Sequence, residues 1–274
     1  MAHLGLAVLA GFAVLSPATA WAQNSPYQFT QPFMVAEANS TTIGQQRAAP
    51  PPVETAPPPE QKWTISLGGL YTRRNVETTA WLPNAEVDYA PTDRIQLHAM
   101  VPYVYDKLEG AGSHFGIGDV ETGVRYRFID DDPDGWRPAV AFYPLLELPT
   151  GDRARNLGTG ETHAFLPLWF SKTLGDWIPY GGGGYWINPG TNNRNWIFLA
   201  LGAIRVINAT WSLTGEVFHA TSSEVGLRDQ TGFSVGARVN LSPYHHVVFT
   251  IGRGLENANE TNQVTGYLAL VLTF

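Results

Sequence analysis

The stretch GYLALVLTF, residues 266–274, shows the pattern that decides the fold. Leu268, Leu270, Leu272 and Phe274 fall on one face of an extended chain, and the residues between them fall on the other. This period of two predicts a β-strand, because a helix would spread the same residues around its circumference. The segment therefore indicates a strand that ends on an aromatic residue.

Other stretches carry the same period with charged residues on one face only. In GDVETGVRYRF, residues 118–128, Asp119, Glu121, Arg125 and Arg127 share one face, while the apolar and aromatic residues share the other. In FSVGARVNLS, residues 233–242, the apolar face alternates with a face that carries Arg238. Such half-polar strands are typical of a sheet with two different surroundings.

Strands of this kind recur throughout the chain from Trp63 onward. About twelve are expected, with soft boundaries, near 63–72, 80–90, 94–106, 117–129, 136–148, 161–173, 177–188, 195–206, 210–220, 230–241, 245–253 and 263–274. Short turns at 91–93, 131–135, 174–176, 208–209 and 242–244 alternate with longer gaps at 73–79, 107–116, 149–160, 189–194, 221–229 and 254–262. Short turns at one end and long loops at the other predict an all-β, antiparallel, up-and-down transmembrane barrel.

A soluble sandwich or lipocalin-like barrel is the alternative, since it also shows alternation. Its outer face would carry plentiful charge, whereas charged residues make up only 15% of this chain and aromatic residues 12%. The aromatic residues fall near strand ends, as membrane-interface girdles require: Trp63, Tyr71, Trp81, Tyr89, Tyr103, Tyr105, Trp136, Trp177, Trp196, Trp211 and Phe274. The membrane barrel is the favoured interpretation.

The segments before the barrel have a different composition. Residues 1–22 combine an apolar run from Leu4 to Leu15 with small residues before Gln23, which predicts a cleaved signal peptide. Residues 23–62 contain AAPPPVETAPPPE and show no period, which predicts a proline-rich disordered segment in the periplasm. The barrel then spans residues 63–274, in the outer membrane of a Gram-negative bacterium.

The polar face of the strands is predicted to line the barrel interior. The candidate pore-lining residues are Glu86, Asp88, His98, Asp119, Glu121, Arg125, Arg127, Arg137, Glu147, Glu216 and Arg238. One interpretation is a pore that selects solutes by charge and width. The other is an interior closed by ion pairs that only stabilise the wall.

No pattern predicts catalysis, a cofactor or a metal. The chain has no cysteine, and none of its seven histidines stands at a familiar metal-ligand spacing. His219 with Ser222 or Ser223 is the one pairing that would suit a membrane lipid hydrolase, and it lies in no motif. The formal net charge of −7 indicates that nucleic acid is not a partner. The sequence therefore predicts a protein that is not an enzyme.

The segment from about 110 to 274 resembles the outer-membrane family named for the meta-pathway of phenol degradation. The resemblance is carried by Pro149-Thr150-Gly151-Asp152, Leu157-Gly158-Thr159-Gly160, Ser171-Lys172, Leu174-Gly175-Asp176-Trp177, LTGEVF (213–218) and FTIGRGL (249–255). It implies an outer-membrane barrel that takes up small, aromatic or hydrophobic solutes passively. Pro149 to Asp152 would be either a structural turn or a gate.

Three alternatives for function follow from these features. They are a passive channel, a closed structural or binding barrel of the envelope, and, least favoured, an outer-membrane lipid hydrolase. The expected partners are outer-membrane lipids, a small-molecule solute and the barrel-assembly machinery. That machinery would recognise the C-terminal strand through Phe274, which resembles the terminal signal of bacterial barrels.

Overall fold

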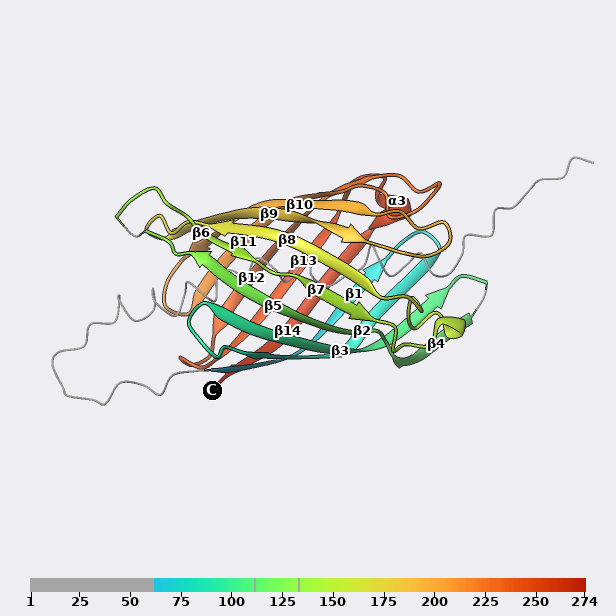
Figure 1. Ribbon diagram of the computed structural model, residues 1–274, viewed down its shortest axis with the longest axis horizontal. Coiled ribbons are helices and arrows are strands. Elements are labelled where there is room, and N and C mark those ends of the chain that lie inside the picture. The colour runs from blue at the N-terminus through green and yellow to red at the C-terminus, as the bar shows by residue number, and fades with distance from the viewer. Residues whose placement is uncertain (1–61, 111, 133) are drawn as a thin grey trace, which may run out of the picture.

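The chain folds into a closed antiparallel β-barrel (Figure 1). The computed structural model describes residues 62–110, 112–132 and 134–274, so the predicted signal peptide and all of the proline-rich segment except Lys62 lie outside the described residues. The strands are β1 (Trp63–Arg73), β2 (Glu77–Tyr89), β3 (Ile95–Leu108), β4 (Gly112–Ile117), β5 (Val120–Ile129), β6 (Ala139–Phe142), β7 (Leu145–Leu148), β8 (His163–Ser171), β9 (Trp177–Ile187), β10 (Trp196–Val206), β11 (Trp211–Ala220), β12 (Gln230–Asn240), β13 (His245–Glu256) and β14 (Val264–Thr273).

These fourteen strands make twelve passes of the wall, as the sequence predicted. Strand β3 pairs with both β4 and β5, so β4 and β5 together form one pass of the wall. In the same way, β8 pairs with both β6 and β7, and these two strands form another pass. The first couple is interrupted at Gly118 and Asp119, the second at Tyr143 and Pro144. Proline has no N–H group to donate to a neighbouring strand, which explains the second break.

The barrel closes by pairing its first and last strands. Their register runs from Thr64 opposite Thr273 to Arg73 opposite Val264. The Phe274 N–H group extends the pairing by donating to the Trp63 carbonyl at 2.8 Å. The first and last strands therefore form a seam that includes Trp63, and both ends of the barrel domain lie at the same rim.

The connections alternate in length less strictly than the sequence predicted. The predicted long gaps at 73–79 and 107–116 are mostly strand, because β1 and β2 leave only residues 74–76 between them, and β3 and β4 leave only 109–111. The polar residues there, such as Ser113 and His114, are paired in strands that project beyond the rest of the wall. Polar side chains cost nothing where a strand leaves the apolar layer, so composition alone could not place these strand ends.

Two short helices occur among the described residues. They are η2 (Arg153–Arg155), in the loop that joins β7 to β8, and α3 (Ala258–Thr261), in the loop that joins β13 to β14. Within the described part of the chain, no helix is long and apolar enough to span a bilayer.

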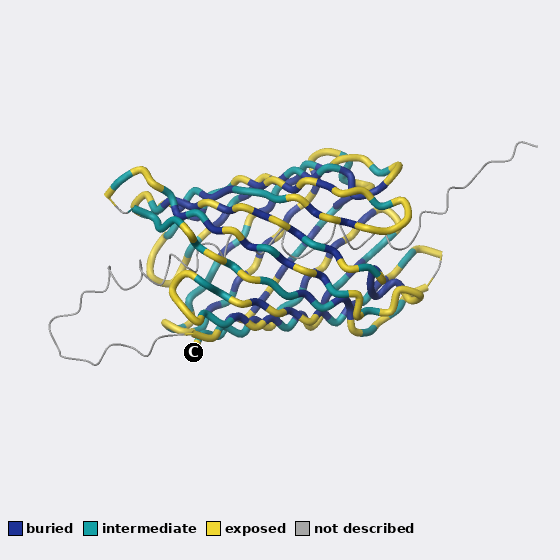
Figure 2. Tube along the Cα trace, viewed as in Figure 1, coloured by how far each residue is buried: buried dark blue, intermediate teal, exposed yellow. Residues whose placement is uncertain are grey.

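Buried and exposed residues alternate along each wall strand (Figure 2). In β14, Leu268 and Leu270 are exposed on the outside, while Tyr267, Ala269 and Val271 are buried on the inside. This is the facing that the alternation predicted. The exterior carries a broad apolar surface, which suits contact with lipid rather than water.

Aromatic side chains stand on the exterior near both rims, with two corrections to the predicted girdles. Trp63, Trp136, Trp177, Trp211 and Phe274 are exposed, as expected. Trp81 and Trp196 instead point inward and are 2% and 1% exposed.

Each exception has a local cause. A register shift between Trp81 and Asn84 reverses the facing of β2 upstream of it, so simple alternation fails there. Trp196 lies on a strand, β10, whose two faces are both apolar, so its sequence pattern does not indicate which face points inward.

Candidate functional site

One part of the barrel interior carries carboxyl and imidazole groups from adjacent strands. We call it the acidic–histidine set; its members are Glu86, Asp88, His98, Glu121, Glu147 and His163. Asp88 lies opposite His98, Glu121 opposite Glu147, and Glu147 opposite His163 in the strand register. Because directly opposite residues of an antiparallel pair share a face, these side chains meet inside the barrel.

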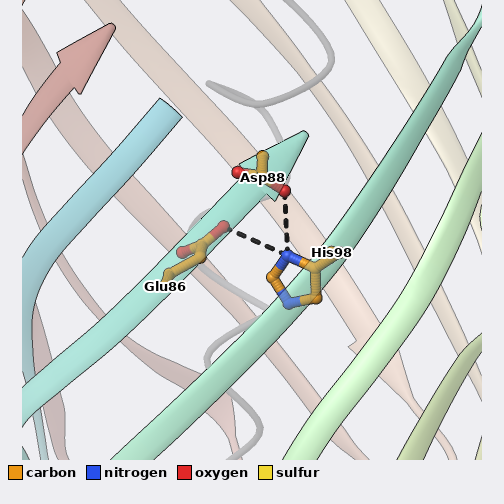
Figure 3. Close-up of side chains that lie close together, drawn as sticks. All are labelled: Glu86, Asp88 and His98. Atoms are coloured by element: carbon orange, nitrogen blue, oxygen red, sulfur yellow. Dashed lines mark hydrogen bonds and ion pairs between the residues drawn. The ribbon is translucent and has the colours of Figure 1, made fainter. Parts of the chain in front are cut away.

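His98 contacts three members of this set, and Figure 3 shows two of these contacts, with Glu86 and Asp88. Its Nδ1 atom lies 3.0 Å from Asp88 Oδ1 and 3.5 Å from Glu86 Oε1, and its Nε2 atom lies 3.3 Å from Glu121 Oε1. The Tyr143 ring meets the imidazole edge-on at 5.9 Å between centroids. The imidazole therefore lies among three carboxyl groups from β2 and β5.

The same atoms form a donor set that was not predicted from the sequence. One ligand atom each from Glu86, Asp88 and His98 lies within 4.8 Å of the others, and all three residues are buried. Two carboxylates and an imidazole are common ligands of divalent metals. The ligands come from two strands of one hairpin, so no sequence motif could have revealed them. The contacts of the His98 imidazole with Asp88 and Glu86 also account for the cluster without a metal.

Asp119 holds a loop rather than facing a free interior. Its Oδ1 atom accepts the Gly151 N–H at 2.8 Å, and its Oδ2 atom accepts the Thr159 N–H at 2.6 Å and the Thr159 hydroxyl at 2.8 Å. Residues 149–162, between β7 and β8, thereby fold back onto the break between β4 and β5. Leu157 from this loop is buried in the apolar core.

The predicted loop motif, Pro149 to Asp152, takes part in this arrangement. The Thr150 hydroxyl donates to the Gly118 carbonyl and accepts the Val120 N–H, both at 2.9 Å. A side chain at Gly151 would collide with the Leu157 carbonyl. Asp152 accepts from the N–H groups of Ala154 and Arg155 and so caps η2. These contacts favour the structural interpretation of the motif.

Of the basic candidates, Arg125 lies near the acidic–histidine set, since its charge reaches Tyr143 together with those of Glu86, Asp88 and Glu121. Arg127 faces inward near the rim at which the chain enters the barrel, where its Nε donates to Asp130 at 3.0 Å. Arg125 faces inward on the same strand, and Arg238 donates to Asn240 at 2.9 Å. Arg137 is exposed in the turn before β6, which corrects the prediction that it lines the interior. The strand predicted from 136 begins only at Ala139, because the turn 130–138 is longer than expected.

A second part of the interior carries large rings. We call it the aromatic set; its members are Phe165, Trp169, Trp186, Trp196, Phe198 and Phe218. Trp186 stacks between Phe165 and Trp196, with centroids 4.7 and 5.3 Å apart. This set was not among the residues predicted from the sequence. The available signal was that β8 and β10 are apolar on both faces, which inside a barrel requires an apolar stretch of lining.

The glycine run at 181–184 makes room for these rings. A Cβ atom at Gly184 would come within 2.7 Å of the Phe165 ring, and one at Gly182 within 2.9 Å of the Trp169 ring. Both rings lie flat against the wall because the neighbouring strand has no side chains at these two inward positions. The run thus has the role expected of strand glycines that admit close neighbours.

Glu216 stands apart from the acidic–histidine set, on β11. It is 4% exposed and shares the inward face of its strand with Phe218. His219, the candidate base of a lipid hydrolase, points away from this face. Its Nδ1 atom lies 2.9 Å from the Thr231 hydroxyl, and the Ser222 hydroxyl donates to the Glu224 carbonyl. The structure brings no serine hydroxyl to this histidine among the described residues.

Comparisons with known proteins agree with the barrel. The model of the family described as "Putative MetA-pathway of phenol degradation" matches residues 58–270, which extends the resemblance well before residue 110. An outer membrane channel from Pseudomonas putida F1 has 17% identity, with coverage of 81% of this chain and 100% of that chain at a TM-score of 0.61.

Two porins share the same fold. The NanC porin has 10% identity, with coverage of 77% of this chain and 98% of that chain at a TM-score of 0.54. The KdgM porin has 8% identity, with coverage of 77% and 99% at a TM-score of 0.52. No curated protein sequence matches the chain.

Proposed function

The chain belongs to the phenol-degradation MetA-pathway family, and from this premise we propose that it is an outer-membrane channel for passive uptake of small amphiphilic solutes, aromatic ones included. In this proposal the short turns face the periplasm, together with both ends of the barrel domain. The likeness to an outer membrane channel and to two porins supports the proposal through the shared fold.

The single observation that carries the proposal is the division of the interior. The aromatic set lies on β8 to β11, and most of the acidic–histidine set lies on β2, β3, β5 and β7. A planar ring can stack on the first, while a hydroxyl or amine on the same solute can exchange hydrogen bonds with the second. Neither surface alone would suit a solute that has both an apolar body and a polar group.

Single-channel recording tests this proposal. The purified protein in a planar bilayer is expected to give discrete conductance steps that benzyl alcohol interrupts. Cyclohexylmethanol, its saturated counterpart, should interrupt the current less, because it lacks the π-system that stacks. Aromatic pairing contributes about 0.5–1.5 kcal/mol, so Trp196→Leu should shorten the benzyl alcohol interruptions by roughly 2- to 10-fold.

Trp211→Leu is the matched control, since this tryptophan is exposed on the exterior. Its interruptions should last as long as those of the unaltered protein. Equal interruption by the two alcohols would contradict the role of the aromatic set. Complete absence of conductance from a correctly inserted barrel would contradict the channel itself.

A closed structural or binding barrel is the second candidate, and one observation favours it. Each ring of the aromatic set is at most 3% exposed, so the interior is filled at that level. This candidate predicts that benzyl alcohol still binds to the detergent-solubilised barrel while no conductance step occurs. The same recordings therefore separate the two candidates.

A further inference from the structure

Glu216 is a buried carboxyl group, and the nearby Tyr180 hydroxyl interacts with it. Neither of its oxygens has a donor in good hydrogen-bond geometry among the described residues, and the residue is only 4% exposed. No described lysine, arginine or histidine forms an ion pair with it. A buried carboxylate in this condition costs several kcal/mol unless a cation or a donor compensates for it.

Small residues and the Tyr180 ring surround the carboxyl group of Glu216. The residues opposite it on β10 and β12 are Gly202 and Ser234, both small. Tyr180 lies across Gly202, and its hydroxyl is 3.4 Å from the Thr214 hydroxyl. A side chain at position 202 would collide with the Tyr180 ring, so the glycine lets this ring lie close to the wall.

Aromatic rings border the same position. Phe218 lies two residues further along the inward face of β11 and stacks with Phe198, with ring centroids 6.2 Å apart. The carboxyl group of Glu216 therefore stands between the Tyr180 ring and the beginning of the aromatic set. A carboxylate beside aromatic faces is a combination that attracts an organic ammonium, through charge and through cation–π contact.

We propose that Glu216 is an ammonium-binding subsite of the interior, so that small amines with an aromatic or aliphatic body are favoured solutes. The amine N–H groups donate to the two carboxyl oxygens of Glu216, and the apolar body extends toward Phe218 and Phe198. This proposal rests on the channel function proposed above, and it adds a class of solute.

A metal ion is a poorer fit at this position. Hard cations such as calcium require six or more oxygen ligands, and magnesium an octahedral set. The neighbourhood of Glu216 supplies one carboxyl group and the hydroxyls of Tyr180, Thr214 and Ser234. An ammonium needs only acceptors for its own N–H groups and gains from the rings as well.

The test compares benzylammonium with benzyl alcohol as blockers of single-channel current. The two have the same ring and differ in charge, so stacking is matched. In the unaltered protein, benzylammonium is expected to block the current at a concentration at least about 10-fold lower than benzyl alcohol does. A charge-assisted hydrogen bond would give a difference of this size. Glu216→Gln should remove this difference and leave block by benzyl alcohol unchanged, whereas Glu216→Asp should retain part of it.

Glu109→Gln is the control, because Glu109 is exposed in the loop between β3 and β4. It should behave as the unaltered protein. Equal block of the unaltered protein by benzylammonium and benzyl alcohol, or an undiminished preference in Glu216→Gln, would overturn the proposal. Block by calcium ion that competes with benzylammonium at equal concentration would also overturn it, in favour of an inorganic cation site.

A second measurement keeps this proposal separate from the channel function. Calorimetric titration of the detergent-solubilised barrel with benzylammonium is expected to show binding that Glu216→Gln abolishes, whether or not the barrel conducts. Binding without conductance would remove the channel and retain the subsite. Conductance without a preference for benzylammonium would remove the subsite and retain the channel.

Discussion

At the scale of single residues, Asp119 shows how one buried carboxylate can organise a long loop. Three donors from residues 149–162 converge on its two oxygens, and the residue is only 2% exposed. Gly158 packs so closely that a side chain there would collide with Oδ1. The loop is therefore held by one charge-assisted cluster rather than by its own secondary structure.

Asp119→Asn should loosen this loop. The amide retains only one acceptor oxygen and presents an NH₂ group to backbone donors, so at least one hydrogen bond is lost. Hydrogen bonds to charged groups contribute about 1.5–3 kcal/mol, and the free energy of unfolding should fall by a similar amount. Amide exchange at Gly151 and Thr159 should accelerate strongly. Asp134→Asn, in the exposed turn 130–138, is the control; equal exchange in both variants would contradict the role of Asp119.

The residue scale also shows where sequence reasoning succeeded. Alternation placed Glu86, Asp88, Glu121 and Glu147 on the inward face, and they lie there. It could not show that Asp88 meets His98, because this contact depends on the register of the hairpin. It also misplaced Trp81, because a bulge shifts the facing by one residue without leaving a mark in the pattern.

At the scale of elements, β10 illustrates the limit of reading a strand from polarity. Trp196, Phe198 and Ala200 face the interior, and Ile197, Leu199 and Leu201 face outward, so both faces are apolar. Such a run resembles a strand buried on both sides in a soluble protein. Only the neighbouring strands reveal that its inner face lines part of the barrel and its outer face meets lipid.

Leu201→Arg should destabilise the barrel in a lipid bilayer. Leu201 lies in the middle of β10 and is 64% exposed on the exterior, so an arginine there would enter the apolar layer. The expected loss is about 2–4 kcal/mol in the free energy of unfolding near the bilayer centre. Denaturant unfolding from liposomes measures it.

Val225→Arg provides the comparison for this loss. Val225 is also exposed, but it lies in the loop 221–229, where an arginine meets water. Its free energy of unfolding should change by less than about 0.5 kcal/mol. If the two arginine variants were equally stable, the outward face of β10 would not be in contact with lipid.

At the scale of the whole molecule, an ion pair joins two loops at one rim of the barrel. This rim lies opposite the one that carries Trp63. Arg228 in the loop 221–229 forms a two-pronged ion pair with Glu260 in α3, and Asn257 donates to the Asp229 carbonyl at 2.6 Å. The hydrogen bond from Arg228 lowers the pKa of Glu260. The carboxylate is exposed, so the link between the two loops depends on pH and on salt.

Acid should release this link between the two loops. A carboxyl group whose pKa is lower in the folded state than in the unfolded state stabilises the folded state. This contribution is fully present above the unfolded-state pKa of about 4.3, and it is lost as the pH falls through the folded-state pKa. Amide protection factors in residues 221–229 and 257–263 should therefore drop below about pH 4. Glu260→Gln should show the low protection at every pH. Protection in the unaltered protein that does not change with pH would contradict this role of the pair.

Much of the whole architecture followed from the sequence, for a physical reason. A barrel in a membrane needs strands of fixed length, two-faced alternation and turns at one rim, and each requirement leaves a mark in the chain. The break at Gly118 and Asp119 leaves no such mark, since it depends on a loop more than thirty residues later. The carboxyl of Glu216 was visible as a candidate, but the absence of a well-aligned donor to it was not.

The seam between β1 and β14 has a consequence for the order of assembly. Thr64 pairs with Thr273, so the contact that closes the wall joins residues from nearly opposite ends of the described chain. Contacts of such high sequence separation are costly to form early, because the intervening chain must first be ordered. Until then, β1 and β14 each present an unpaired row of N–H and C=O groups, which in a bilayer have no water to satisfy them. We therefore expect this seam to close late in folding, and we expect shielding of those two edges to speed maturation.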